Sequence, residues 1–440
     1  MTVLKRCREV MRAARLAVVG AVFLTACSSI LDVTLPGKVT SDDLNDPALA
    51  AALANGVVIT FECAWTSYVA AANALSDEVL SASGQANTNV WGLRGILSNN
   101  VNLLDNCDAN AGGYAALVPL QQARVLADNA AAKLAAYPDA VVTNKAFLLA
   151  QVKTYGAYAT LPLGEGFCQQ AFDQGPLLSP AQALAVAETR FTDALAAATA
   201  ASNADLKNMA LAGRARVRLD LGNFAGARAD AELVTAGYVK NATRGATERQ
   251  RWNLLYELQN NDGSVVQRHV TIAPAFRDVQ WQGVADPRVK VTATGQLSAD
   301  GVTPWFKHNK ALSRSDPVLI ASSREARLII AEAAARGGDL TTARQIINDL
   351  HTAAAIPGYD SGNTATQAEI ITQIIDERSR ELFLEVGARY SDHLRFRATQ
   401  WNIPFRGEPG SVHPNGVDQR GQQYGTTTCI PLTDAETLGR

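Results

Sequence analysis

The chain has 440 residues, of which 47% are hydrophobic and 19% are charged, and its formal net charge is −2. This composition is that of a globular protein with ample material for a core, and it excludes a largely disordered or low-complexity chain. Since Lys and Arg form no stripe interleaved with aromatic residues, we also expect no nucleic acid as a partner.

The first 26 residues have the pattern of a bacterial lipoprotein signal peptide. Residues 1–15 are basic, and the apolar run LAVVGAVFL at 16–24 is too short for a stable membrane span but typical of a secretion signal. The junction LTAC matches the lipobox, in which an aliphatic residue and small residues precede a lipid-modified cysteine. We therefore predict cleavage before Cys27 and acylation of its thiol, which would anchor the protein in membrane lipid.

The residue after the cysteine bears on the destination. Ser28 stands where an Asp would favour retention in the inner membrane, so we predict a lipid-anchored protein of the outer membrane. Residues 27–40 would then be a lipidated tether, and residues 41–440 a single domain. The alternatives are an ordinary signal peptide with a chance cysteine, or a buried N-terminal helix.

Four cysteines remain in the predicted domain: Cys63, Cys107, Cys168 and Cys429. In an oxidising compartment they can form two disulfides, with three possible connectivities. We favour the pairs 63–107 and 168–429, because the first pair flanks one compact segment; free buried thiols are the alternative. The sequence has no Cys-x-x-Cys pair and no Cys/His cluster with zinc spacing, so we predict neither a metal site nor a cofactor.

Most of the domain has the pattern of helical hairpins. Ser179, Pro180 and Gln182 supply an N-cap, a first-turn proline and a capping box for a helix over 179–202. The segments 209–238 and 327–351 each predict two helices joined by a tight turn, the plan of a tetratricopeptide hairpin.

The turns of these two hairpins carry the same signal. In Gly222-Asn223 and Gly338-Asp339 the glycine suits the turn and the polar residue caps the next helix. With a further helical pair around 114–160, we predict a mainly α fold. In it, tetratricopeptide-like hairpins form a superhelical scaffold over about 114–240 and 318–396.

Two segments interrupt this scaffold. Residues 241–317 are rich in Pro, Gly and aromatic residues and show only short alternating stretches, so we predict an irregular insert with small strands and a functional role. Residues 397–440 are similarly predicted to be rich in loops.

No catalytic motif is present: the sequence lacks a zinc-protease pattern, a nucleophile elbow, a P-loop and a dinucleotide fingerprint. The densest charged stretch is 376–396, where Glu377, Glu381, Glu385 and Arg389 follow each other at i, i+4 steps of a predicted helix. Such spacing favours a structural ion network over a catalytic acid–base pair. We predict that the protein is not an enzyme.

Several segments together resemble the SusD/RagB family. They are LDVTLPGKVTSDDLNDPALAAALANG after the lipobox, ADPRV at 285–289, ERSRELFLEVGARYSDHLRF at 377–396 and CIPLTDAE at 429–436, where Thr433 replaces the usual proline. The resemblance implies a mostly helical, SusD-like lipoprotein that acts as a hinged lid on a TonB-dependent outer-membrane transporter of the SusC/RagA kind. Such proteins capture glycans or peptides and pass them to the channel.

A glycan ligand would require exposed aromatic rings with polar neighbours, because sugar C–H faces stack on Trp and Tyr. The candidate ligand-binding residues are Trp65, Tyr68, Asn73, Trp91, Arg94, Trp281 and Trp305, with Asp77 and Asn99 as further polar neighbours. The segments 90–95 and 278–283 are the preferred parts of this surface. The alternative is that each Trp simply packs against a hairpin core.

The sequence therefore predicts a non-catalytic surface lipoprotein that captures a nutrient oligomer, a glycan first and a peptide second, for a TonB-dependent transporter. The alternative is a structural tetratricopeptide-type lipoprotein that assembles an envelope complex. That alternative predicts a concave groove lined by hairpin residues, without an aromatic platform on the loops.

Overall fold

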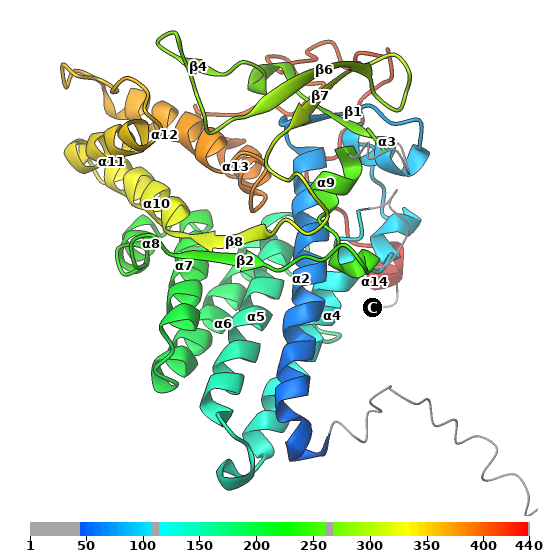
Figure 1. Cartoon of the computed structure of the whole chain (residues 1–440), viewed down its shortest axis with the longest axis vertical. Helices are drawn as coiled ribbons and strands as arrows, with labels where there is room; N and C mark the ends of the chain where they lie inside the picture. Colours follow the sequence, from blue (N-terminus) through cyan, green and yellow to red (C-terminus); the bar gives the residue numbers. More distant parts are fainter. Residues whose placement is uncertain (1–44, 108–113, 260–266, 439–440) are drawn as a thin grey trace, which may run out of the picture. The chain divides into compact units, whose positions relative to one another are not determined.

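The structure is a computed structural model that describes residues 45–107, 114–259 and 267–438 (Figure 1). Pro47–Arg440 forms one compact unit. The predicted signal peptide, the lipidated Cys27 and the tether lie outside the described residues.

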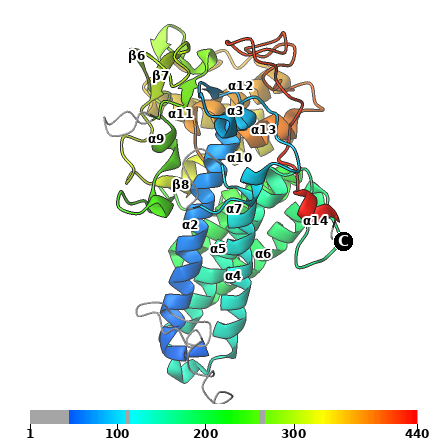
Figure 2. The same ribbon diagram turned by 90° about the vertical axis from the view of Figure 1, so that its right-hand side faces the viewer.

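A long helix, α2 (Ala50–Leu75), runs through the middle of this unit, beside α4 (Leu117–Ala136) and α5 (Lys145–Glu165) (Figure 2). Every residue from Phe61 to Leu75 is buried. With the turn that precedes it, this helix is long and apolar enough to cross a membrane by length and composition alone. Because it is buried on all sides from Phe61 onward, it is a core helix over that part of its length.

The rest of the scaffold is a stack of helices in hairpins, which confirms the predicted mainly α fold. After α4 and α5 come α6 (Pro180–Ala200), α7 (Ala204–Asp220), α8 (Phe224–Ala231), α10 (Ser323–Arg336) and α11 (Leu340–Ala353). Successive helices pack against each other along the stack (Figure 1).

Local chemistry shapes these helices as predicted. Ser179 and Gln182 form the capping box of α6. Gly222 has φ +74° in the turn before α8, where the Asn223 side chain accepts a hydrogen bond from the Gly226 N–H at 3.0 Å. The turn before α11 repeats this geometry, with Gly338 at φ +84°.

The stretch 376–396 is not one helix, which corrects the prediction. It divides into α12 (Gln367–Glu381) and α13 (Ala388–Phe396). Leu384, Val386 and Gly387 all have positive φ between the two helices. The turn is held by α2 and its end: the Leu384 N–H donates to the Glu78 carboxylate at 2.8 Å, and the Leu384 carbonyl accepts from the Asn73 amide at 3.1 Å.

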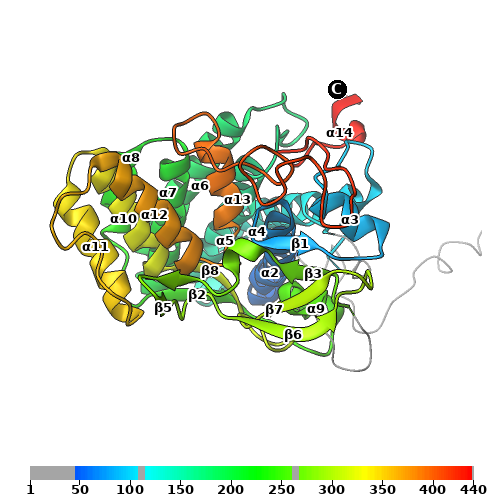
Figure 3. The ribbon, with the colours of Figure 1, turned by 90° about the horizontal axis from the view of Figure 1, so that it is seen from above.

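The strands pair in two-stranded antiparallel sheets, and all of them except β1 belong to the insert or its flanks. The four pairs are β1 (Val79–Ser81) with β3 (Val270–Ile272), β2 (Val239–Ala242) with β8 (Val318–Ser322), β4 (Gln280–Trp281) with β5 (Val284–Ala285), and β6 (Val291–Leu297) with β7 (Pro304–His308). Figure 3 shows β1, β3, β6 and β7 grouped beside the short helix α9 (Leu254–Gln259).

Short helices complete the described chain. They are α3 (Ala86–Gly92), α14 (Asp434–Leu438), and the 3-10 turns η2 (Pro47–Leu49), η3 (Val101–Leu104), η4 (Asp139–Val141), η5 (Arg249–Arg251) and η6 (Pro274–Phe276). Between α13 and α14 the chain is irregular, in agreement with the predicted loop-rich segment. The buried Arg406 fastens this segment by donating hydrogen bonds to the carbonyls of Ala74 and Val79.

Disulfides join Cys63 to Cys107 and Cys168 to Cys429, the connectivity that the sequence favours. The first links α2 to the segment after η3. The second links the end of the α5 region to the C-terminal segment.

Candidate functional site

Six of the predicted ligand-binding side chains are buried. Trp65, Tyr68 and Trp91 have an exposed fraction of 0%. Asn73, Arg94 and Trp305 are also buried. A buried ring has no face on which a sugar could stack, and a buried polar side chain cannot reach a ligand at the surface. The prediction that these six residues form a binding surface is therefore wrong.

Each of them has a structural partner instead. Trp65 and Tyr68 belong to the aromatic core of α2, where the Trp65 indole N–H donates to the Leu319 carbonyl at 2.7 Å. Trp91 packs against Tyr114, with ring centroids 5.3 Å apart. The Arg94 guanidinium pairs with Glu408 at 3.2 Å. These side chains hold the core together.

The two polar neighbours have different surroundings. Asp77 is engaged by Arg389, whose guanidinium lies 2.6 Å from its carboxylate. Desolvation raises the pKa of Asp77, but the charges of Arg389 and His393 outweigh it and leave that pKa well below its ordinary value. Asn99 is exposed.

Trp281 is the predicted residue that remains partly exposed. It lies on the β4–β5 hairpin, and its ring centroid is 6.2 Å from that of Tyr359 and 5.0 Å from that of His351. The guanidinium of Arg380 lies 5.6 Å from the Trp281 centroid. Within the described residues the indole Nε1 of Trp281 has no hydrogen-bond partner. Trp281 and Tyr359, which we call the hairpin platform, form a partly exposed aromatic pair, in which the indole nitrogen of Trp281 is itself buried.

A buried charge network supports this platform. Arg288 contacts Asp286 at 2.6 Å and Glu377 at 2.6 Å, and Glu377 also lies 2.8 Å from the Nε2 of His351. Desolvation raises the pKa of Glu377, but the hydrogen bond with His351 and the charge of Arg288 outweigh it and leave that pKa below its ordinary value. The carboxylates are therefore ionised and neutralised by their partners, as in the structural network that the sequence predicts.

A second set of buried carboxylates surrounds Arg216. Its Nε lies 2.6 Å from Glu165 and 3.6 Å from Glu325. Desolvation raises the pKa of both carboxyl groups, and Asp220 nearby is affected in the same way. These groups lie between packed helices, away from the cavities described below, so their geometry supports a role in packing.

Within the described residues, no group of three or more His, Cys, Asp or Glu side chains is placed to hold a metal ion.

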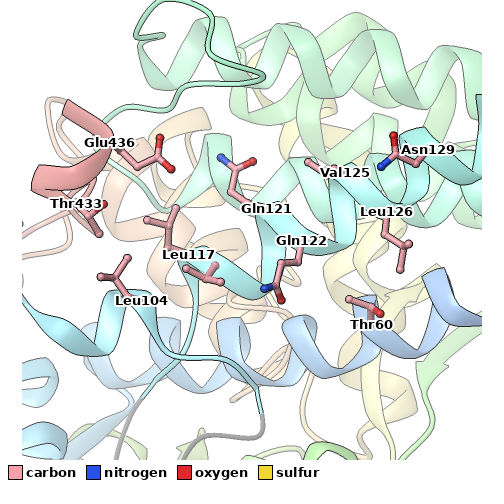
Figure 4. A pocket seen from close by; sticks show the side chains of 11 residues that line it. Thr60, Leu104, Leu117, Gln121, Gln122, Val125, Leu126, Asn129, Thr433 and Glu436 are labelled. Atoms are coloured by element: carbon pink, nitrogen blue, oxygen red, sulfur yellow. The ribbon is translucent and has the colours of Figure 1, made fainter. Parts of the chain in front are cut away.

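A groove of about 610 Å³ opens along α4, between α2, η3 and α14 (Figure 4). We call it the α4 groove, and it is lined by Thr60, Leu104, Leu117, Val118, Gln121, Gln122, Val125, Leu126, Asn129, Thr433 and Glu436. Its size is within the range of small-ligand pockets in proteins. Sequence analysis could not reveal this groove, because no motif marks it and its lining residues come from segments that are distant in the chain.

Two smaller cavities lie near it. One of about 300 Å³ shares Thr60 and Gln122 with the α4 groove and reaches Gln250. Another of about 410 Å³ lies between α4, α5 and α6 and is lined by charged residues that include Asp128, Lys153 and Arg190.

The SusD family model matches residues 325–429 of this chain. Among solved structures, the chain is similar to a SusD-like carbohydrate binding protein from Bacteroides vulgatus, with 14% identity and a TM-score of 0.65 over 89% of this chain and 96% of that one. A SusD superfamily protein from Parabacteroides distasonis matches with 13% identity and a TM-score of 0.65, over 91% and 98% of the two chains. The resemblance to the SusD/RagB family is confirmed.

This SusD-like fold spans nearly the whole of the described chain. Surface glycan-binding protein A from Bacteroides uniformis shares it as well, with 13% identity and a TM-score of 0.62 over 89% of this chain and 98% of that one. No curated protein matches the chain. At this level of identity the likeness is one of fold, so the ligand site is argued from the geometry of this chain.

Proposed function

We propose that this SusD-like protein is a non-catalytic, cell-surface lipoprotein that captures an oligosaccharide and delivers it to a TonB-dependent outer-membrane transporter. The SusD-like fold over nearly the whole described chain carries the proposal. Solved structures with this fold are described as carbohydrate binding or surface glycan-binding. The lipobox before Cys27 supports a lipid anchor in the outer membrane.

The hairpin platform is the proposed contact for the glycan. Trp281 lies on the β4–β5 hairpin next to Tyr359. The residues at the tip of this hairpin, Gln282, Gly283 and Val284, are exposed. A sugar ring stacked on the exposed part of the Trp281 ring would bury its C–H face. The buried network around Arg288 holds the platform rigid, which lowers the entropic cost of binding.

The domain organisation follows from the same proposal. Residues 1–26 are removed, residues 27–40 connect the acylated cysteine to the fold, and residues 41–440 act as one domain with its ligand-facing insert at about 241–317. A Cys27→Ala variant of the full chain should leave the membrane fraction, whereas a Ser28→Ala variant should stay in it.

Glycan binding is tested on a soluble form that begins at Ser28. We expect at least one oligosaccharide on a glycan array to bind. Trp281→Ala should then weaken its binding about tenfold, equivalent to ~1.4 kcal/mol. Trp401→Ala is the matched control, because Trp401 is also partly exposed but stacks on Arg336 at 5.2 Å, away from the hairpin. Equal losses in the two variants would contradict the platform.

The transporter is tested by affinity purification of the full chain from outer membranes, with a TonB-dependent channel expected among the co-purified proteins. A specific observation favours the scaffold alternative: the α4 groove is lined largely by residues of the scaffold helix α4, and its lining residues include no aromatic ring. Recovery of another envelope complex without such a channel would support that alternative and contradict glycan delivery.

A further inference from the structure

The sequence contains two Asn-Gly pairs, Asn55-Gly56 and Asn415-Gly416. Asparagine is among the thermally labile residues of proteins. When glycine follows it, the backbone nitrogen of the glycine can attack the side-chain amide, because no side chain shields that nitrogen. Sequence alone does not distinguish the two pairs, whereas the structure does, by the hydrogen bonding of each glycine nitrogen.

The pair Asn55-Gly56 is held in a helix. Both residues lie inside α2, where each backbone N–H donates to the carbonyl four residues earlier, so the Gly56 nitrogen is engaged. Asn55 is exposed, and a Cβ atom added at Gly56 would meet no atom within 4 Å. Neither burial nor crowding protects this pair, and only the hydrogen bonding of the helix does.

The pair Asn415-Gly416 lies in the irregular segment between α13 and α14. Asn415 is exposed, and within the described residues neither its side chain nor the Gly416 N–H has a hydrogen-bond partner. Gly416 has φ +79°, and the nearest atom to an added Cβ would be the Gln423 Oε1 at 3.8 Å. The amide and the nitrogen that can attack it are therefore both uncrowded and unbonded.

The pair Asp300-Gly301 shows that a glycine with positive φ is not sufficient. Gly301 has φ +73°, but its N–H donates to the Ser298 carbonyl at 3.0 Å. The Asp300 carboxylate accepts hydrogen bonds from the Val302 and Thr303 N–H groups at 3.0 and 2.9 Å. Here the nitrogen and the carboxylate are both held. Of the Asn-Gly and Asp-Gly pairs in the described chain, 415–416 is the unrestrained one.

We propose that Asn415 is a site of spontaneous deamidation in the folded protein. The Gly416 nitrogen forms a bond with the Asn415 Cγ, the bond from Cγ to Nδ2 breaks, and the side-chain nitrogen leaves as ammonia with the proton of the Gly416 N–H. Water then opens the succinimide ring at either carbonyl and gives aspartate or isoaspartate. The reaction turns a neutral amide into a carboxylate, and the inference does not rest on the proposed glycan function.

The isoaspartyl product would disturb the hairpin that begins at Gly416. Its backbone is longer by a methylene group just before Gly416, whose carbonyl accepts from the Tyr424 N–H at 2.9 Å. The far end of this hairpin contacts β1 and the insert, because the Gln419 amide donates to the Ser81 carbonyl at 3.0 Å and to the Thr303 hydroxyl at 3.2 Å. We therefore expect the modification to loosen the hydrogen bonds at the base of this hairpin.

The site is tested by incubating the chain that begins at Ser28 at pH 8 and 37 °C. Peptide mapping by mass spectrometry follows the conversion of amide to acid at both pairs. Asn415 should convert at least about tenfold faster than Asn55, since ~1.4 kcal/mol of local opening in α2 is enough for that factor. In guanidinium the unfolded chain should convert the two sites at similar rates. Equal rates in the folded protein, or conversion of Asn415 only in the unfolded chain, would overturn the proposal.

The succinimide step is tested on the tryptic peptide 407–420. Isoaspartate in this peptide, detected with an isoaspartyl methyltransferase, identifies the ring, because direct hydrolysis of the amide gives aspartate alone. The rate should rise with pH, since the Gly416 nitrogen must lose its proton to attack. Asn415→Gln is the control and should stay unconverted, because glutamine would have to form a larger ring. Aspartate without isoaspartate would overturn the step.

The effect on the hairpin is measured by hydrogen exchange of the Tyr424 N–H. In the isoaspartyl protein this N–H should exchange at least about fivefold faster than in the unconverted protein. Asn415→Asp is the matched control, because it carries the charge without the extra methylene group, and it should exchange like the unconverted protein. Equal exchange in the isoaspartyl and unconverted proteins would contradict the effect on the hairpin.

Discussion

At the scale of single residues, Glu78 shows how the fold controls a proton. Its carboxylate accepts a hydrogen bond from the Leu384 N–H at 2.8 Å, and it lies 3.2 Å from the Ser76 hydroxyl. Desolvation, only partly offset by the Leu384 hydrogen bond, raises the pKa of Glu78 to about 8. The side chain therefore keeps its proton at neutral pH while it fastens the turn between α12 and α13.

This pKa predicts a pH dependence of stability. Between the ordinary value of 4.5 and about 8, folded Glu78 holds a proton that the unfolded chain has lost. Its contribution to the free energy of unfolding therefore decreases as pH rises through that window, by up to ~1.4 kcal/mol per pH unit. Glu78→Gln, which cannot ionise, should remove this part of the decrease.

Urea unfolding at pH 5, 6, 7 and 8 measures the effect. Relative to the wild type, Glu78→Gln should gain stability steadily as the pH rises. The exposed Glu248→Gln serves as control and should run parallel to the wild type. A wild type and Glu78→Gln variant with parallel pH profiles would show that Glu78 ionises normally.

The predicted ligand residues show what residue type alone leaves out. Trp, Tyr and Arg are common in glycan sites, but they also fill cores, and only tertiary packing decides between the two. Trp91 is buried because Tyr114, a residue beyond the next 3-10 turn, covers it. Trp281 stays at the surface because it lies on a two-residue strand of a projecting hairpin.

At the scale of elements, the sequence predicts helices where the signals are local. The turns at Gly222 and Gly338 were predictable because a glycine and the capping residue after it define them within a few positions. Helix α2 has no such signal. It is buried all round from Phe61 onward, so apolar and polar residues follow no period of 3.6.

The prediction of one helix over 376–396 is wrong for the opposite reason. Its charges follow a helical period, but a distant helix interrupts it: Asn73 of α2 and Glu78 bind both backbone groups of Leu384. The predicted ion network survives this break because its cations come from elsewhere in the chain, as Arg288 does. Periodicity cannot reveal partners that lie about 90 residues away.

Two glycines of this scaffold allow a matched test of backbone conformation. A Cβ atom added at either Gly56 or Gly222 would meet no atom within 4 Å. Gly56 lies inside α2, so Gly56→Ala should stabilise the fold by about 0.5–1 kcal/mol. Gly222 has φ +74°, so Gly222→Ala should destabilise it by about 1–2 kcal/mol.

Thermal and guanidinium unfolding of the two variants measure these free energies. Because steric clashes are absent at both positions, the opposite signs of the two changes in the free energy of unfolding report the effect of backbone conformation alone. A loss of stability in both variants would contradict the assignment of Gly56 to a regular, open helical position.

At the scale of the whole molecule, segments from every part of the sequence meet at α2. Trp65 binds the Leu319 carbonyl before α10, Asn73 binds the Leu384 carbonyl after α12, and Arg406 reaches the Ala74 carbonyl from the C-terminal segment. The scaffold and the insert therefore share one core. We expect Pro47–Arg440 to unfold as a single cooperative unit.

Guanidinium unfolding followed by far-UV and near-UV circular dichroism checks this expectation. The two signals should change together, with the same midpoint and slope. A first transition that removes the near-UV signal while the helical signal persists would show that the insert unfolds separately from the scaffold.

The disulfide between Cys168 and Cys429 also constrains how the protein is made. Its two cysteines are separated by 261 residues, so the bond cannot form until nearly all of the chain has been synthesised. The pair 63–107, separated by 44 residues, becomes available much earlier. The N-terminal loop can therefore be closed by its disulfide well before the C-terminal segment can be joined to the helices.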